Sequence, residues 1–247
     1  MIKGLYTSAL GLSVLNKQQE VTANNLANAQ TAGYKKDVLI AESFPEMLLY
    51  RLNASEDSGK IPPQVGSLPL GVKINDVYTD YHPGARRTSE NPLSLALAGE
   101  GYFTVQTPQG ERYTRNGEFT LDAQARLVST DGYPLMGEKG EIMVKGSDVQ
   151  VDPEGRVYSE GVELDRLKIV NFSTPPVKEG SSLFRGANPQ QVANPTILQG
   201  TIEESNVQPL TEMVNMISIM RAYEANQKVV QSIDATLDKA VNEVGRL

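Results

Sequence analysis

Residues 205–247 read SNVQPLTEMVNMISIMRAYEANQKVVQSIDATLDKAVNEVGRL, and no other stretch constrains the architecture as strongly. Taken at alternating steps of three and four, ten positions fall in one register: Met216, Ile219, Tyr223, Asn226, Val230, Ile233, Leu237, Ala240, Val244 and Leu247. Nine of the ten are apolar or aromatic, and a 3.5-residue repeat of this length indicates a coiled-coil seam. Asn226 is polar, and such a residue often fixes the register at some cost in stability.

We expect this helix to begin near Ser205, because Ser205 and Gln208 have the spacing of a capping box. Pro209 would still lie in the first turn, where its missing N–H costs little. From there to Leu247 the helix would be about 60 Å long. Its first half should touch more than one neighbour, because it is apolar on more than one side, through Leu210, Met213, Val214, Ile217 and Met220.

The N-terminal segment shows the same spacing at Leu5, Ser8, Leu12, Leu15, Gln19, Thr22, Leu26 and Ala29. The pattern stops near Ala32 and Gly33, and a glycine there suits a left-handed helix end. A secretory signal peptide is the alternative interpretation, but polar residues interrupt the apolar run and the periodicity continues past a cleavage point. We therefore predict that the two terminal helices pair with each other as a coiled coil, with ordinary two-helix packing inside a globule as the simpler alternative.

Between the helices, turn signals recur every eight to twelve residues, which is typical of an all-β domain. Asp131-Gly132 and Asp152–Gly155 are two such turns. Strands are expected at 102–106, 118–121, 142–144 and 167–172. The predicted class is α+β, with an all-β middle domain inserted between the paired helices. The predicted parts are an N-terminal helix (1–34), a connector with a flexible excursion at 53–67 (35–84), the β domain (85–190), a return linker (191–204) and the C-terminal helix (205–247).

The composition excludes several classes of function. The 247 residues carry a net charge of −7, and a pI near 4.9 argues against a nucleic-acid binder. Cysteine is absent and histidine occurs once, at His82, so thiol chemistry and multi-histidine metal sites are excluded. No phosphate-binding loop or EF-hand occurs, and the acidic residues around Asp152 are explained by a turn. We expect no enzyme activity, no cofactor, no metal and no membrane-spanning helix, although a carboxylate-based hydrolase acting on peptidoglycan stays open.

A polar run ends the N-terminal helix: residues 23–36 read ANNLANAQTAGYKK. Its amide and hydroxyl side chains both donate and accept hydrogen bonds, so they are able to bridge packed helices. The simpler interpretation is a polar helix end followed by a turn.

Three motifs resemble those of the flagellar basal-body rod proteins, and they occur in that family's order. The first is Asn24–Asn28 with Thr31–Lys35; the second is Gly99–Phe103 with Tyr113–Phe119; the third is Gln199–Val207 with Glu212–Ile217 and Arg221–Glu224. The resemblance covers essentially the whole chain. Two features depart from it: Ala125 stands where the family usually has glycine, and the pair Arg86-Arg87 is not typical.

The resemblance implies an axial structural protein of the mid-sized rod types, proximal or distal (the F and G classes). Such subunits stack into a helical tube between motor and hook, with the helices inside and the β domain outside. It implies export by the flagellar type III apparatus without a cleaved signal peptide, and partners among copies of itself and other rod and hook subunits. We expect packing contacts and register-setting contacts between subunits at Leu5, Leu12, Asn24, Asn25, Leu26, Asn28, Ile217, Tyr223, Asn226, Ile233 and Leu237.

Two other functions remain open at this point. One is a hook or hook-junction protein, which would use the same contacts at another axial position. The other is a secreted β domain that binds cell-wall glycan and is oligomerised by a coiled coil.

Overall fold

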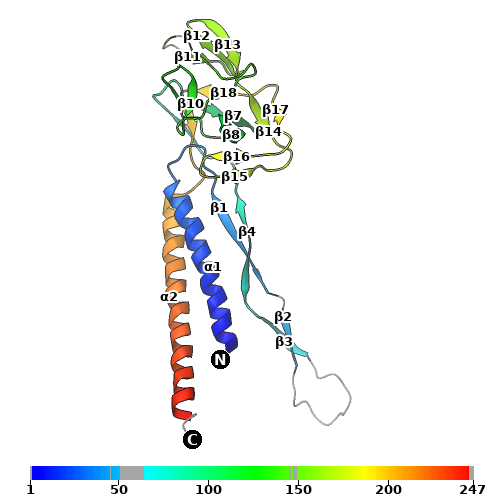
Figure 1. The fold of residues 1–247 in the computed structure, drawn as a ribbon, viewed down its shortest axis with the longest axis vertical. Coiled ribbons are helices and arrows are strands. Elements are labelled where there is room, and N and C mark those ends of the chain that lie inside the picture. Colours follow the sequence, from blue (N-terminus) through cyan, green and yellow to red (C-terminus); the bar gives the residue numbers. More distant parts are fainter. Residues whose placement is uncertain (1, 45, 51–63, 145, 147–148, 245–247) are drawn as a thin grey trace. The chain divides into compact units, whose positions relative to one another are not determined.

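The chain begins and ends in a helix and forms strands in between (Figure 1). The computed structural model describes residues 2–44, 46–50, 64–144, 146 and 149–244. The chain divides into two units, which we treat separately. The helical unit comprises residues 1–26, 37–78 and 209–247, and the β unit comprises residues 27–36 and 79–208.

The helical unit contains two long helices and two pairs of antiparallel strands. Its helices are α1 (Ile2–Ala27) and α2 (Pro209–Lys239), and α2 continues into a π-helical turn, η1 (Ala240–Val244). Strand β1 (Asp37–Ser43) pairs with β4 (Val72–Thr79), and β2 (Glu46–Tyr50) pairs with β3 (Gln64–Pro69). Of the predicted flexible excursion at 53–67, residues 53–63 lie outside the described residues.

The β unit is built from short strands joined by tight turns. Its six-stranded sheet has the order β15 (Val177–Glu179), β16 (Leu183–Arg185), β8 (Gly110–Thr114), β7 (Tyr102–Thr107), β14 (Ile169–Asn171) and β17 (Gln190–Gln191). A three-stranded sheet contains β11 (Val149–Val151), β12 (Arg156–Ser159) and β13 (Val162–Arg166). The remaining pairs are β9 (Phe119–Leu121) with β10 (Leu127–Ser129), β6 (Leu95–Leu97) with β18 (Ile197–Gln199), and β5 (Arg86–Thr88) with β19 (Thr201–Glu203).

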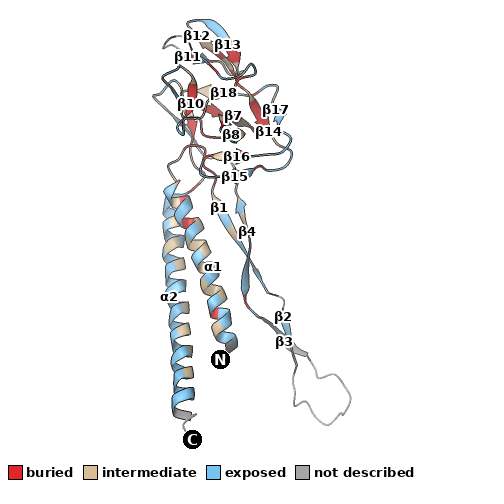
Figure 2. Ribbon diagram, in the orientation of Figure 1, coloured by how far each residue is buried: buried red, intermediate tan, exposed pale blue. Residues whose placement is uncertain are grey.

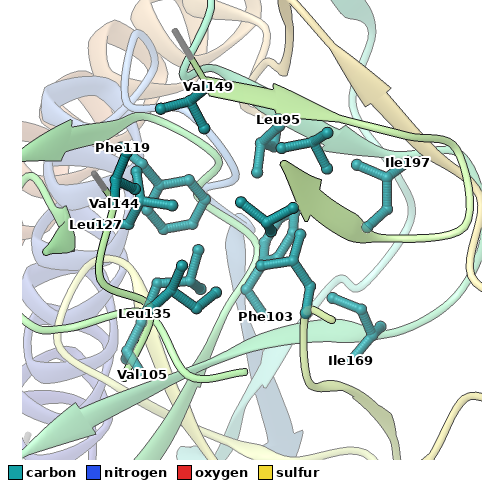
Figure 3. Close-up of a cluster of buried hydrophobic side chains, with 14 of the residues drawn as sticks. Leu95, Phe103, Val105, Phe119, Leu127, Leu135, Val144, Val149, Ile169 and Ile197 are labelled. Carbon is teal, nitrogen blue, oxygen red and sulfur yellow. The ribbon is translucent and has the colours of Figure 1, made fainter. Parts of the chain in front are cut away.

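A hydrophobic core fills the β unit, and its side chains converge from many strands (Figure 3). Phe103 and Phe119 meet edge to face at its centre, with ring centroids 5.3 Å apart, and both are fully buried. This geometry is favourable for aromatic pairs. The β unit therefore buries its large apolar side chains in a core of its own.

The expected turns and strands of this region agree with the structure, with two exceptions. Gly155 N–H donates to the Asp152 carbonyl in the turn between β11 and β12, as the Asp-Pro-Glu-Gly sequence predicts. Residues 142–144 form no strand; Met143 makes an isolated bridge with Arg126. Residues 191–204, expected to be a linker, carry β18 and β19.

The coiled coil predicted for the terminal helices is wrong. The helices lie side by side and antiparallel, with Gly4 facing Ile233 and Gly11 facing Asn226 (Figure 1). However, no described residue of α2 is buried, whereas the seam of a coiled coil inserts each apolar residue into a hole of the partner helix. The reason lies in α1, which presents small or polar residues along its own stripe, Ser8, Gln19 and Thr22 among them.

The helix ends also differ from the sequence expectation. Helix α2 begins at Pro209 rather than near Ser205, and the Ser205 hydroxyl accepts a hydrogen bond from Val207 N–H at 3.2 Å instead of capping the helix. Helix α1 ends at Ala27, so the residues up to Gly33 form turns rather than helix.

The departure at Ala125 is visible as backbone strain. Ala125 has a φ of 58°, in the left-handed region, while its N–H donates to the Asp122 carbonyl at 3.0 Å. The Asp122 carboxylate holds the turn by accepting from the N–H groups of Gln124 and Arg126. The chain thus retains a turn that favours glycine although an alanine occupies it.

We predict that Ala125→Gly stabilises the β unit. A left-handed alanine costs about 1–2 kcal/mol, which exceeds the extra backbone entropy that glycine loses on folding, so a gain of up to about 1 kcal/mol is expected. Urea unfolding of the full chain measures it. Ala123→Gly is the matched control, because Ala123 lies in the same loop without a positive φ and should lose stability. Equal losses in both variants would contradict the assignment of strain to Ala125.

Candidate assembly surface and buried charge cluster

The helical unit leaves most of its apolar side chains in contact with solvent (Figure 2). Among the residues described, Val14 is its one buried apolar side chain. The first half of α2 is exposed along a row that we call the α2 stripe: Leu210, Met213, Val214, Ile217 and Met220. Exposed apolar rows of this extent mark surfaces that bind another molecule.

The β1–β4 ribbon also carries exposed apolar side chains. Two-stranded ribbons are marginally stable on their own. This one is attached to α1 where Gly71, with a φ of 152°, is buried so close to Leu10 that a Cβ would lie 2.7 Å from the Leu10 Cδ1 atom. Its solvent-facing apolar side chains are Val38, Ile40, Val72, Ile74 and Tyr78.

The predicted interface residues fall into two groups on the helices. Ile217 and Tyr223 are exposed, with 52% and 37% of their surface accessible. The others are partly covered by neighbours within the chain: Leu5, Leu12 and Leu26 on α1, and Asn226, Ile233 and Leu237 on α2. Two members of this second group lie where α1 meets α2, since Ile233 faces Gly4 and Asn226 faces Gly11.

The three asparagines near the end of α1 do not share one environment. Asn24 is exposed, whereas Asn25 is buried and bonds to Asp37 at the start of β1. The Asn25 amide donates to the Asp37 carbonyl at 2.8 Å and accepts from its N–H at 2.9 Å. Asn28 accepts from the Thr31 hydroxyl at 3.3 Å. Asn25 thus fixes the path from α1 into β1.

A cluster of buried charges lies in the β unit. Glu203 accepts from Lys35 Nζ at 2.5 Å and from Arg115 Nε at 2.6 Å, and also from the Gly84 N–H at 3.2 Å. The Lys35 and Glu203 side chains are 3% and 2% exposed. Arg115 also donates to the carbonyls of Gly99 and Gly101. Every charge in the cluster therefore has a partner, as buried charges require.

The surroundings shift the ionisation of this cluster. Burial raises the pKa of Glu203, but the positive charges of Arg115 and Lys35 outweigh it and hold that pKa below the ordinary value of 4.5. Burial lowers the pKa of Lys35, and the neighbouring Arg115 acts in the same direction, against the attraction of Glu203.

The sequence motifs did not identify this cluster as a unit. Lys35, Arg115 and Glu203 each belong to a different one of the three motifs, and the structure brings those motifs together at one point. The signal in the sequence was a charged residue inside each motif, but nothing in the spacing indicated that the three would meet. The Arg86-Arg87 pair has a simpler role, because Arg87 on β5 bonds Glu204 at 3.0 Å at the surface.

The described part of the chain offers no group of three or more His, Cys, Asp or Glu side chains arranged to hold a metal ion. The imidazole of His82 is exposed and bonds Asp80, two residues earlier. No helix among the described residues is long and apolar enough to cross a membrane.

We predict that Glu203 makes the β unit sensitive to acid. Because its pKa is lowered in the folded state, its contribution to stability is complete above pH 4.5 and is lost as the pH falls through the folded pKa. Urea unfolding across this pH range should show a steeper loss for the wild-type chain than for Glu203→Gln. Glu204→Gln, which removes an exposed carboxylate on the adjacent residue, should keep the wild-type slope. Equal slopes in all three proteins would refute the role of Glu203.

Three family models match this chain, and together they cover more than half of its residues. Residues 5–35 match the family model described as "Flagella basal body rod protein", residues 96–159 match "Flagellar hook protein FlgE/F/G D1 domain", and residues 198–243 match "Flagellar basal body rod FlgEFG protein C-terminal". These three segments contain most of α1, the centre of the β core, and the whole of α2 with the stripe defined above.

Curated relatives match over the full length. The flagellar basal-body rod protein FlgF of Caulobacter vibrioides is 31% identical over 100% of both chains. The flagellar hook-basal body complex protein FlhO of Bacillus subtilis is 29% identical over 100% of both. The flagellar basal-body rod protein FlgG of Buchnera aphidicola is 30% identical over 97% of this chain and 98% of its own. The chain therefore belongs to the flagellar basal-body rod protein family.

Proposed function

We propose that this chain is a structural subunit of the rod of the bacterial flagellar basal body and that it assembles through its helical unit. One observation carries the proposal. The β unit has a complete core, whereas the helical unit has one buried apolar side chain among its described residues. A chain built this way gains stability when neighbours cover its helices.

The size of the expected gain follows from the α2 stripe. Burying one large aliphatic side chain contributes about 1.5–3 kcal/mol, so even partial coverage of five such side chains is enough to favour assembly. In the proposed rod, the stripe packs against a different surface of the next subunit. Contacts between two different surfaces that do not close into a ring generate an open helical array.

The residues assigned to these contacts follow from their exposure. Ile217 and Tyr223 are open to a neighbouring subunit as they stand. The partly exposed residues present their uncovered part to the next subunit: Leu5, Leu12, Leu26, Asn28, Asn226, Ile233 and Leu237. Asn24 is exposed to it, and the buried Asn25 acts indirectly, by fixing the path from α1 into β1. The proposed partners are other copies of this chain and other rod and hook subunits. Export through the flagellar type III apparatus and a location in the basal body belong to the same proposal.

The alternatives rank lower on specific grounds. A hook or hook-junction position would use the same surfaces, and full-length relatives named as basal-body rod proteins favour the rod. A binding module oligomerised by a coiled coil needs a closed apolar seam, which α2 lacks. A structural role also requires no catalytic residues.

We predict that Ile217→Asp blocks assembly. A charge placed in the α2 stripe would be buried without a partner in the rod, at a cost of several kcal/mol. A strain carrying this variant in place of the wild-type gene should lose swimming motility, while the purified variant keeps the melting temperature of the β unit. Asn215→Asp, on the opposite side of α2 and also exposed, is the matched control and should swim normally. Normal motility in Ile217→Asp would contradict assembly through the stripe.

A strain that lacks the gene locates the subunit along the axis. Electron cryotomography of its basal bodies should show a rod that is missing or cut short, and the level of truncation separates a proximal from a distal position. A complete rod with an absent hook would favour the hook-junction alternative. A complete rod and hook would reject the axial role.

A further inference from the structure

Two short segments of the β unit, one after α1 and one before α2, are bonded directly to each other. We call them the clamp, residues 33–36 and 203–206. The Gly33 N–H donates to the Glu203 carbonyl at 2.8 Å, and the Lys36 N–H donates to the Asn206 side-chain oxygen at 2.8 Å. With the Lys35–Glu203 ion pair, these bonds cross-link the two segments through both backbone and side chains.

The centre of the clamp is buried and tightly packed at Gly33, Tyr34, Lys35 and Glu203, whereas Lys36 and residues 204–206 are partly exposed. Gly33 has a φ of 67°, and a Cβ there would lie 2.3 Å from the Arg115 carbonyl carbon, so no other residue fits without backbone movement. Tyr34 is 1% exposed, and Lys178 Nζ lies 3.7 Å from the centre of its ring. Water therefore has little access to the Lys35–Glu203 pair, and exclusion of water strengthens that interaction.

A third segment, residues 80–84, is held by the same side chains. The Asn206 amide donates to the Asp80 carbonyl at 2.8 Å, Lys35 Nζ donates to the His82 carbonyl at 2.9 Å, and Glu203 accepts from Gly84 N–H. Lys35, Glu203 and Asn206 thus join the segments through which the chain enters and leaves the β unit. None of the three belongs to the hydrophobic core.

We propose that the clamp carries tension between the two terminal helices, so that a pull on α1 against α2 bypasses the β core. The chain supports this directly. Helix α1 ends at Ala27 and α2 begins at Pro209, so only short stretches separate each helix from the clamp. The clamp closes residues 37–202 into a loop, and force entering from the helices reaches the clamp before it reaches any core strand. The proposal rests on the proposed function, because a rod subunit is loaded through the parts that pack in the rod.

Single-molecule force spectroscopy on the full chain tests the clamp. Since the chain has no cysteine, two introduced cysteines give unique attachment points. The first pair, Gln30→Cys with Asn215→Cys, places the attachment points on both sides of the clamp. The second pair, Gln109→Cys with Glu163→Cys, applies the force across the β core. All four positions are exposed.

Under constant force on the first pair, we expect Glu203→Gln to shorten the lifetime of the clamped state about tenfold or more, because a buried ion pair loses one charge. Asn206→Ala, which removes a neutral cross-link, should also shorten the lifetime of the clamped state. If Glu203→Gln does not fold, Asn206→Ala alone tests the clamp. Glu204→Gln is the matched control and should keep the wild-type lifetime. On the second pair, both clamp variants should shorten the lifetime much less than on the first pair, because that pull loads the β core before it loads the clamp.

An unchanged lifetime on the first pair in both folded clamp variants would overturn the proposal. So would an equal shortening on the two pairs, since that result indicates a general loss of stability rather than a load path. The measurement uses the isolated chain, so its result does not depend on rod assembly, which the motility of Ile217→Asp tests separately.

Discussion

The structure depends on one constraint, which is that the helical unit cannot bury its own apolar side chains. Two helices and a thin ribbon offer too little surface to cover one another, and α1 supplies small and polar residues where a self-sufficient pair would need large apolar ones. The outcome is α2 without a buried residue in its described length. A surface of this kind has a stable state only when other molecules complete it, and membership of a rod-forming family supplies the molecules that would do so.

The β unit, by contrast, buries its own apolar side chains. Its core draws side chains from many short strands, and its aromatic residues pack at favourable angles. At the point where the chain enters and leaves it, three charges and an asparagine replace apolar packing. Buried charges seldom add net stability over an apolar core, but they tolerate few alternative arrangements. We infer that they are placed here because the entry and exit segments need one defined path, and an apolar patch would allow several.

The sequence predicted local structure well and long-range structure poorly, for physical reasons. Turn signals such as Asp152–Gly155 act over a few residues and were confirmed. The heptads predicted a helix, but whether a seam closes depends on the partner, and the small residues of α1 decided against it. The charge cluster could not be predicted, because Lys35 and Glu203 are 168 positions apart and no pattern along the chain encodes their meeting. Ala125 stood out only by comparison with the family, which usually has glycine at this position. The structure shows that the turn forms with alanine in the left-handed region.

Hydrogen exchange of backbone amides tests the central claim most directly, by comparing the purified chain with basal bodies isolated from cells. We expect amides of α1 and α2 in the purified chain to exchange much faster than those of β7 and β14. Assembly should protect the helices and leave exchange in the β core unchanged. Helices that are as protected as the β core in the purified chain, and that gain nothing on assembly, would contradict this claim.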